Sequence, residues 1–383
     1  MLEQLTEPRL TIGPLLIIFM GALVLSVLAT PMAKRVATRY SVLDAPSSRK
    51  VHTNPVPLLG GAAIYLGVIG SLLLFGHLQY VQQTASILGG ATMMSLLGAW
   101  DDKWGMSPLT KLLGQVAAAS LLFFTGVHVE FLRNDWLNYA ATIAWVVTIT
   151  NSINLMDNMD GLAGGVAAVS SVFFFLTATL TNQNLVAPLA VVLLGACVGF
   201  LYFNFHRASI FMGDTGSLFL GFLLAAVGIK LRFPENLDIV TWMVPVLILG
   251  VPLFDTSLVT LSRIRRRIPV SRGGKDHLSH RLVLLGLTRR EAVMALYLLQ
   301  GALGIAALVV MQADLFEGYS VGAVVLICAL VAMYKLEQVD LTNANPAPPA
   351  RTGSTRFRPF SRRRPTENEP ATQSVTGGPD AVR

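Results

Sequence analysis

The chain alternates between long apolar runs and short polar connections. A helix needs about 17 to 25 apolar residues to cross a bilayer, and about 11 runs meet that length. They lie near residues 11–31, 59–77, 84–100, 109–127, 139–156, 161–181, 185–205, 214–231, 238–262, 291–312 and 319–336. The pattern predicts an all-α, polytopic integral membrane protein.

Composition agrees with this prediction. The chain is 53% hydrophobic and 13% charged, whereas soluble domains carry about 25% charged residues. The alternating pattern of a membrane β-barrel is absent from the sequence. Cys197 and Cys328 each lie within an apolar run and are interpreted as packing residues. The first run has neither a basic segment before it nor an Ala-x-Ala cleavage site, so we expect a retained span.

Lys and Arg residues gather in alternate connections, chiefly in 32–58 and 263–290, and the opposite connections hold few. The positive-inside rule then places the N-terminus outside and the basic connections in the cytoplasm, in a multi-pass protein of the inner membrane. Residues 1–337 form the predicted transmembrane domain. Residues 338–383 are rich in Pro, Ser, Thr and Arg, and we expect a disordered basic cytoplasmic tail that is either solvated or held against anionic lipid.

One polar stripe interrupts the apolar pattern between two runs. Asn151, Asn154, Asp157 and Asp160 recur every third residue, which places them within about a third of a helix's circumference. In a soluble protein this would be a solvated helix face. At a membrane edge, where unpaired carboxylates are expensive, the stripe predicts a functional site.

Further polar groups lie at the same predicted cytoplasmic ends. Alone, each has an ordinary explanation: solvated charge, a helix N-cap or surface histidines. Together they suit a divalent cation that holds a phosphate ester, with cationic groups on the outer oxygens. Mg²⁺ is favoured because the candidate ligands are oxygens, with Mn²⁺ as the alternative, and zinc would need His or Cys at tighter spacing. The groups are Asp101, Asp102, Lys111, Asp214, His277 and His280.

Nucleotide-binding signatures of soluble enzymes are missing. The sequence has no Gly-x-x-x-x-Gly-Lys-Ser/Thr segment, so it supports no P-loop, and no nucleic-acid partner is expected. A secondary transporter is the alternative from another class, because intramembrane acids also mark ion pathways. Transporters place such acids near the midplane and often contain two similar halves. Here the acids gather at one surface and no internal repeat is visible.

The motifs, in their order, resemble those of the polyprenyl-phosphate N-acetylhexosamine-1-phosphate transferases, bacterial glycosyltransferase family 4. The resemblance covers roughly residues 40–285 and rests on the segments 44–61, 101–102, 154–162, 211–217 and 277–281. It implies that a membrane-bound polyprenyl phosphate such as undecaprenyl phosphate attacks the β-phosphate of a UDP-amino sugar. UMP leaves, and the lipid-linked sugar diphosphate starts a cell-wall or surface polysaccharide.

The resemblance also implies roles by position. Asp214 is the expected principal Mg²⁺ ligand, with Asp157 beside it, and Phe211 is expected to stack on the uracil base. A homodimer through outer helices is expected by analogy alone. The implied catalytic residues are Asp101, Asp102, Asp157, His277 and His280, and the implied substrate-binding residues are Lys50, Lys111, Asn154, Asp160, Asn204, Phe211 and Arg281.

The histidine segment bears on the donor. The branch that uses UDP-MurNAc-pentapeptide carries three adjacent histidines after a proline, whereas this chain has His277-Leu-Ser-His280. UDP-GlcNAc is therefore the favoured donor, and UDP-MurNAc-pentapeptide or another UDP-HexNAc stays open as the alternative. The mechanism also has two versions: direct in-line attack by the lipid phosphate, or a covalent phospho-aspartyl intermediate.

One further acid, Asp255, lies about 12 Å inside the ninth run, counted back from Arg263 at about 1.5 Å per residue. Pro252 should bend this helix, and the bend could open a groove for the lipid chain. Equally, Asp255 could be satisfied by Thr256 or by a neighbouring helix.

Overall fold

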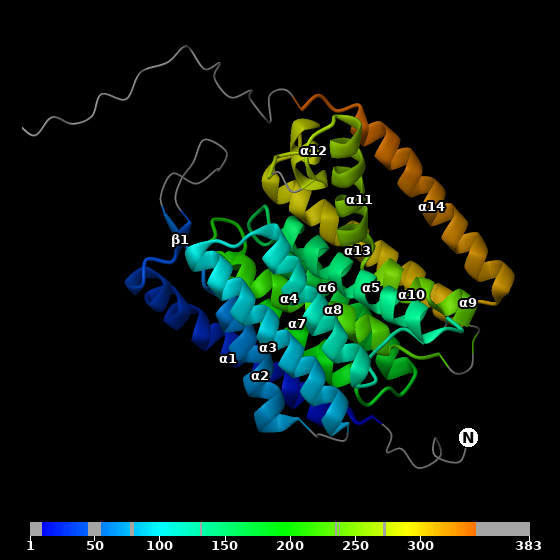
Figure 1. Ribbon diagram of the computed structural model, residues 1–383, viewed down its shortest axis with the longest axis horizontal. Helices are drawn as coiled ribbons and strands as arrows, with labels where there is room; N and C mark the ends of the chain where they lie inside the picture. Colours follow the sequence, from blue (N-terminus) through cyan, green and yellow to red (C-terminus); the bar gives the residue numbers. More distant parts are fainter. Residues whose placement is uncertain are drawn as a thin grey trace, which may run out of the picture. The chain divides into compact units, whose positions relative to one another are not determined.

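The computed structural model is almost entirely helical (Figure 1). It describes residues 10–44, 55–76, 80–130, 132–233, 236, 238–270 and 273–341. The chain divides into two units, Met1–Asn345 and Pro346–Arg383, and the second lies outside the described residues. The predicted tail is therefore described only as far as residue 341, and Lys50 also lies outside the described residues.

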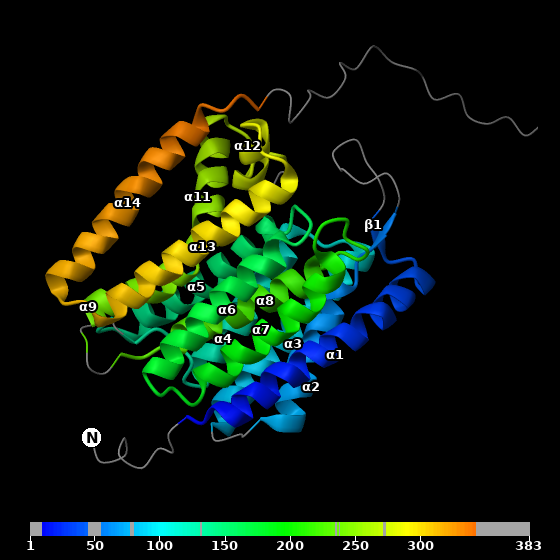
Figure 2. The ribbon, with the colours of Figure 1, turned by 180° about the vertical axis from the view of Figure 1, so that it is seen from behind.

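Eight helices form the first part of the fold. Figures 1 and 2 show them side by side and tilted in the same sense, with β1 beside the end of α1. They are α1 (Ile12–Arg39), α2 (Gly60–Phe75), α3 (Val81–Trp104), α4 (Pro108–Phe124), α5 (Asp135–Met156), α6 (Leu162–Leu180), α7 (Val186–Asn204) and α8 (Gly213–Lys230).

Helix α8 lies at the centre of this bundle. Its apolar window is 89% buried, as expected for a helix that is apolar on every side. Helices α2, α3 and α5 pack against it, and α1 packs against α2 and α7. Together they form the main hydrophobic core.

The second part of the fold consists of shorter and more peripheral helices. Figure 2 shows α14 along the edge of the unit, beyond α11 and α13, and its apolar window is only 6% buried. Such exposure suits a helix that faces lipid. These helices are α9 (Asp238–Thr241), α10 (Met243–Ile248), α11 (Gly250–Arg265), α12 (Leu278–Leu284), α13 (Arg289–Gln312) and α14 (Leu315–Glu337).

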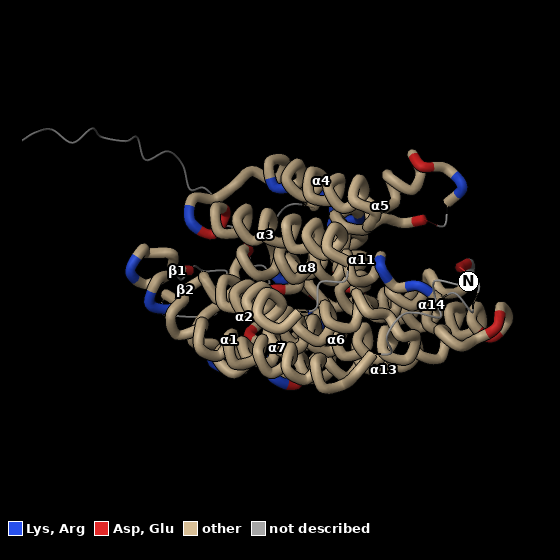
Figure 3. Tube along the Cα trace, turned by 90° about the horizontal axis from the view of Figure 1, so that it is seen from below, with Lys and Arg blue, Asp and Glu red and all other residues tan. Residues whose placement is uncertain are grey.

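Six of the described helices are long and apolar enough to cross a bilayer: α1, α6, α7, α8, α13 and α14. The prediction of an all-α integral membrane protein is confirmed at this level. Figure 3 shows that Lys, Arg, Asp and Glu lie mostly at helix ends and in connections, where charged groups can stay hydrated.

The predicted ninth span, 238–262, is not one helix. It breaks into α9, α10 and α11, because Pro245 and Pro252 each lack the N–H that would continue the helical ladder. The buried Gln300 satisfies the backbone at the second break. Its side chain accepts a hydrogen bond from Val251 N at 3.1 Å and donates one to Ile248 O at 2.7 Å. The break therefore lies before Pro252, and its polar groups are paired within the protein.

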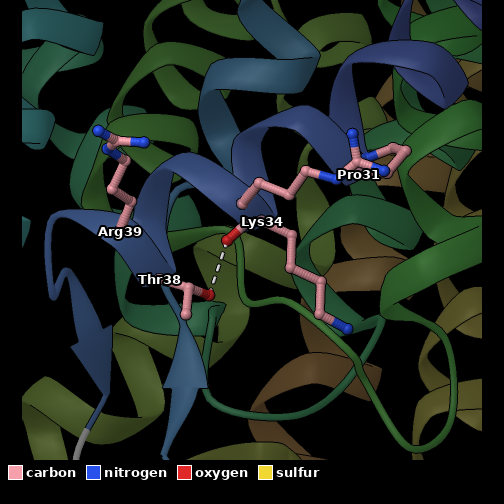
Figure 4. A pocket seen from close by; sticks show the side chains of 5 residues that line it. Pro31, Lys34, Thr38 and Arg39 are labelled. Carbon is pink, nitrogen blue, oxygen red and sulfur yellow. Dashed lines mark hydrogen bonds between the residues drawn. The ribbon is translucent and has the colours of Figure 1, made fainter.

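Two other elements differ from the expectation. Helix α1 continues past Pro31 to Arg39, so part of the first connection is helical. A shallow hollow of about 660 Å³ lies along this extension, lined by Pro31, Lys34, Arg35, Thr38 and Arg39 (Figure 4). Thr38 Oγ1 donates to Lys34 O there at 2.9 Å. Cationic side chains at a helix end suit the phosphate level of a bilayer.

A two-stranded antiparallel ladder follows α1. β1 (Leu43–Asp44) pairs with β2 (Val56–Pro57), with Leu43 opposite Pro57. Phe211 N then donates to Pro57 O at 2.8 Å, and Gly60 N donates to Phe211 O at 2.9 Å. The first connection is thereby fixed to the start of α8.

Candidate active site

Most of the predicted polar residues that the structure describes lie at one end of the bundle, where α3, α5 and α7 finish and α4, α6 and α8 begin; we call this the site end. The best-defined contact joins α3 to α8. Asp102 accepts hydrogen bonds from Asp214 N at 2.8 Å, from Thr215 N at 3.0 Å and from Thr215 Oγ1 at 2.6 Å. A carboxylate at a helix N-terminus is favoured by the unpaired N–H groups and the helix dipole. Asp102 therefore holds the first turn of α8.

Two glycines allow this approach. Gly213 has φ +70°, and a Cβ there would lie 2.6 Å from an Asp102 carboxylate oxygen. At Gly98 a Cβ would lie 2.2 Å from Asp214 O. Since real Cβ atoms do not approach backbone so closely, α3 and α8 can touch only because both positions are glycine.

Lys111 bridges two carboxylates from different helices. Its Nζ lies 2.5 Å from Asp101 Oδ2 and 2.5 Å from Asp214 Oδ2. The sequence suggested that Asp101 and Asp102 follow the third helix, but α3 continues to Trp104. The pair therefore occupies the last turn of α3, where Asp101 faces Lys111 and Asp102 faces α8.

The other oxygen of Asp214 is held by α5. Asn154 Nδ2 donates to Asp214 Oδ1 at 2.8 Å and to Ser217 Oγ at 2.9 Å. Asn154 thus connects the polar stripe of the sequence to the first turn of α8. Asn151, one turn earlier, pairs instead with Gln115 of α4. The stripe therefore contacts both α4 and α8.

Asp157 follows the last residue of α5 and caps that helix. Burial raises the pKa of Asp157 to about 8, and the negative charges of Asp214, Asp102 and Asp160 act in the same direction. A carboxylate in this position gains from a cation placed near it. Asp102, Asp157, Asp160 and Asp214 are therefore close enough to influence one another.

The donor set fits a hard divalent cation, although the arrangement is not a complete cage. Within the described part of the chain, no group of three or more His, Cys, Asp and Glu side chains is placed to hold a metal ion. Asp101 and Asp214 do share a common cation position, which Lys111 Nζ fills. Mg²⁺ usually takes one or two protein carboxylates and completes its shell with water and substrate phosphate, so these two carboxylates suffice.

The α7–α8 connection begins after Asn204 and contains Phe211. Asp160, which lies between α5 and α6, contacts this connection. Asp160 Oδ2 accepts from Ala208 N at 3.0 Å. The buried Asn204 accepts from Gly161 N and donates to Ile210 O, both at 2.9 Å. Asn204 therefore fixes the two loops that carry Asp160 and Phe211, and its amide is used within the protein.

The histidine segment is joined to the stripe and to α11. Ser279 Oγ donates to Asn158 Oδ1 at 2.7 Å, which connects it to the neighbour of Asp157. Asp255 accepts from Leu278 N at 2.6 Å and lies 2.9 Å from His277 Nδ1. Asp255 is thus satisfied by the histidine segment, and among the described residues Thr256 Oγ1 has no hydrogen-bond partner.

The two histidines differ in environment. His277 is buried against Asp255, whereas His280 is partly exposed, with the ring centroids 6.5 Å apart. Burial lowers the pKa of His280 to about 4, and His277 and Lys275 act in the same direction. His280 is therefore neutral at pH 7 in the substrate-free protein.

Arg281 lies apart from these groups and is fully buried. It donates to Asp276 O at 2.9 Å, to Ser262 Oγ at 2.8 Å and to Glu337 Oε1 at 3.1 Å, and its Nη1 lies 2.5 Å from Leu336 O. Its guanidinium therefore joins α11 and α12 to the end of α14. The family resemblance implied a substrate contact for Arg281, which stays a prediction; the hydrogen bonds of its guanidinium in the structure are to protein groups.

Comparison with known proteins identifies the family of this chain. The glycosyl transferase family 4 profile matches residues 84–232. A probable undecaprenyl-phosphate N-acetylglucosaminyl 1-phosphate transferase of Bacillus subtilis is 35% identical over 311 residues, covering 79% of this chain and 86% of the relative. The chain belongs to glycosyl transferase family 4.

Two less similar relatives carry related names. A decaprenyl-phosphate N-acetylglucosaminephosphotransferase of Mycobacterium tuberculosis is 33% identical over 330 residues, 76% of this chain and 81% of the relative. An undecaprenyl-phosphate alpha-N-acetylglucosaminyl 1-phosphate transferase of Escherichia coli is 25% identical over 281 residues, 70% of this chain and 76% of the relative. The family profile spans the part of the chain from α3 to α8, which includes Asp101, Asp102, Asp157, Asp160 and Asp214.

Several supporting residues at the site end have contacts for which the sequence predicted no role. Thr215 and Ser217 belong to the Gly-Asp-Thr-Gly-Ser segment, which was interpreted as a helix start, and their hydroxyls turn out to contact Asp102 and Asn154. Asn158 and Ser279 join two segments 121 residues apart. Only a three-dimensional contact identifies that pair, since Asn158 lies in a turn after α5 and Ser279 lies in the first turn of α12.

Proposed function

We propose that this family 4 protein transfers GlcNAc-1-phosphate from UDP-GlcNAc to undecaprenyl phosphate or a related polyprenyl phosphate, with release of UMP and with Mg²⁺ as cofactor. One observation carries the proposal: Asp101 and Asp214, from two different helices, share a single cation position, and Asn154 holds the other oxygen of Asp214. The names of the three relatives support the sugar and the class of lipid.

The site end is proposed to face the cytoplasm, in the inner membrane. Two described parts of the basic segments 32–58 and 263–290 contact this end: Pro57 accepts from the backbone of Phe211, and Ser279 donates to Asn158. By the positive-inside rule such connections stay in the cytoplasm. A cytoplasmic site also matches a soluble sugar nucleotide as donor.

Each group has a separate task in this proposal. Asp101 and Asp214 would hold the Mg²⁺, which when bound neutralises charge on the departing diphosphate; Mn²⁺ is the alternative. Lys111 supplies positive charge next to the phosphates. Neutral His280 can donate a hydrogen bond to a phosphate oxygen, and Phe211 offers a ring to the uracil.

Direct attack by the lipid phosphate is the favoured step. A phosphate monoester has a second pKa of about 6, so at pH 7 the acceptor is largely dianionic without a strong general base. Among the alternative nucleophiles Asp101, Asp102 and Asp157, Asp101 already has an oxygen engaged by Lys111. A carboxylate held by a cation attacks phosphorus poorly, which disfavours a phospho-aspartyl intermediate.

The test is incorporation of labelled UMP into UDP-GlcNAc by the purified protein with Mg²⁺. Exchange is expected only when undecaprenyl phosphate is present. Exchange without the lipid would support the covalent route instead. No exchange with any UDP-HexNAc tried would overturn the proposed activity.

A variant pair completes this test. Asp214→Ala should abolish exchange while leaving the gel-filtration profile intact. Asp135→Ala, which removes an exposed carboxylate at the opposite end of α5, should keep wild-type exchange. An active Asp214→Ala variant would contradict the assigned role of this carboxylate.

A further inference from the structure

The ammonium group of Lys111 occupies the position between two carboxylates where a bound cation would be expected. Its Nζ is 2.5 Å from an oxygen of Asp101 and 2.5 Å from an oxygen of Asp214, and its side chain is 18% exposed. The remaining oxygen of Asp214 is held by Asn154. The Lys111 charge therefore offsets a pair of carboxylates that would otherwise repel one another.

The start of α4 fixes this placement. Ser107 caps the helix by accepting from Thr110 N at 3.1 Å, and Pro108 occupies the first turn. Lys111 N donates to Ser107 O at 3.1 Å, so the Lys111 backbone is held at the first helical turn. Its long side chain, in contrast, has several rotatable bonds and can change direction without moving the helix.

An ammonium group and a divalent cation cannot share these oxygens. Mg²⁺ binds oxygen at about 2.1 Å and demands near-octahedral geometry, so it would need the space that Nζ fills. Two carboxylates balance one divalent ion, whereas one ammonium leaves a net negative charge. The stronger cation can displace the weaker one once the released ammonium has another anion to bind.

We propose that Lys111 is a resident counter-ion that occupies the cation position of the substrate-free site. It leaves Asp101 and Asp214 when a divalent cation enters, and its ammonium then binds a phosphate oxygen of the sugar nucleotide. This inference rests on the proposed function, because it takes the divalent cation from there. The exchange makes metal binding depend on the donor substrate: without a diphosphate to receive Lys111, the cation binds weakly.

Manganese binding without turnover tests this exchange. Free Mn²⁺ is measured by electron paramagnetic resonance during titration of purified protein, with and without UDP-GlcNAc and in the absence of lipid acceptor. Without nucleotide, Lys111→Met is expected to bind Mn²⁺ at least tenfold more tightly than wild type. UDP-GlcNAc should tighten binding strongly in wild type and much less in Lys111→Met.

Lys103→Met is the matched control. Lys103 lies at the end of α3 with its Nζ 4.5 Å from the Trp104 ring centroid, and its removal should leave Mn²⁺ affinity at the wild-type value. Lys111→Gln serves as a second variant if the methionine protein does not fold, with the same expected direction.

The failures of the two proposals can be told apart. Equal or weaker Mn²⁺ binding by the Lys111 variants, with wild type still binding in the presence of UDP-GlcNAc, overturns the counter-ion role alone. No Mn²⁺ binding by any protein, even with the nucleotide, overturns both the counter-ion role and the proposed metal site.

Discussion

Asp102 fixes the backbone of Asp214, 112 residues later in the chain, through a hydrogen bond of 2.8 Å. Together with the two bonds from Thr215, this contact makes Asp102 a positioning residue for α8, although it adjoins Asp101 in sequence. Adjacent carboxylates thus have different tasks, because successive helical residues point about 100° apart.

Asp102→Asn should therefore destabilise the protein as well as inactivate it. Hydrogen bonds to charged groups contribute about 1.5 to 3 kcal/mol each, so we expect the free energy of unfolding to fall by about 2 to 4 kcal/mol. Asp101→Asn should lose activity with a much smaller change in melting temperature. Thermal unfolding in detergent measures the stability of both variants. Equal melting temperatures for the two variants would refute this division of tasks.

The contact between α3 and α8 offers a matched pair of glycine substitutions. Gly98→Ala places a methyl group against Asp214 O, so it should lower the melting temperature by several degrees and abolish UMP exchange. Gly89→Ala lies on the same helix with no atom within 4 Å of its Cβ. It should leave stability unchanged or raise it by up to about 1 kcal/mol. A stable, active Gly98→Ala protein would mean that the two helices separate without loss of function.

The Asp255–His277 pair predicts non-additive kinetics. Asp255 orients the ring and the backbone of the histidine segment, so Asp255→Asn and His277→Asn should each lower kcat by at least about tenfold, with smaller effects on KM. If the residues act as a unit, the double variant should be no slower than the slower single variant. Additive losses in this double-mutant cycle would show that the two side chains act independently.

The high pKa of Asp157 predicts a pH-dependent stability in metal-free protein. The folded protein keeps a proton on Asp157 up to about pH 8, whereas an ordinary aspartate loses it near 3.8. The folded state therefore binds more protons over this range, and the stability from this group is lost as pH rises through 8. In EDTA, the melting temperature of wild type relative to Asp157→Asn should fall between pH 6 and pH 9.

A control and a contrary outcome define that experiment. Asp135→Asn, at the exposed opposite end of α5, should follow the wild-type pH dependence. A constant difference between wild type and Asp157→Asn across the range would mean that Asp157 is ionised throughout in the folded protein.

The sequence predicted most of the helices, because a run of about 20 apolar residues in a bilayer has few alternatives to a helix. It also placed Asp101, Lys111, Asn154 and Asp214 in one site, through the distribution of basic residues and the resemblance to a family. Those signals lie along the chain and need no knowledge of packing.

The rest depended on contacts that no local pattern contains. The division of the ninth span at Leu249 required Gln300 to satisfy the freed backbone, and Gln300 lies in a helix that begins 40 residues later. The burial of Arg281 required Glu337 to approach from α14. Long-range polar partners of this kind decide whether a charged residue faces a substrate or the protein interior.

The interrupted backbone between α10 and α11 has a consequence for the histidine segment that is hydrogen-bonded to α11. The side chain of Gln300 on α13 pairs with the backbone where α11 begins, and α11 carries Asp255, whose carboxylate holds the imidazole of His277. The placement of His277, for which we predict a role in the reaction, thus depends on a helix that supplies none of the candidate site residues. A change in the Gln300 hydrogen bonds would then be expected to misalign His277, even with every candidate site residue still present.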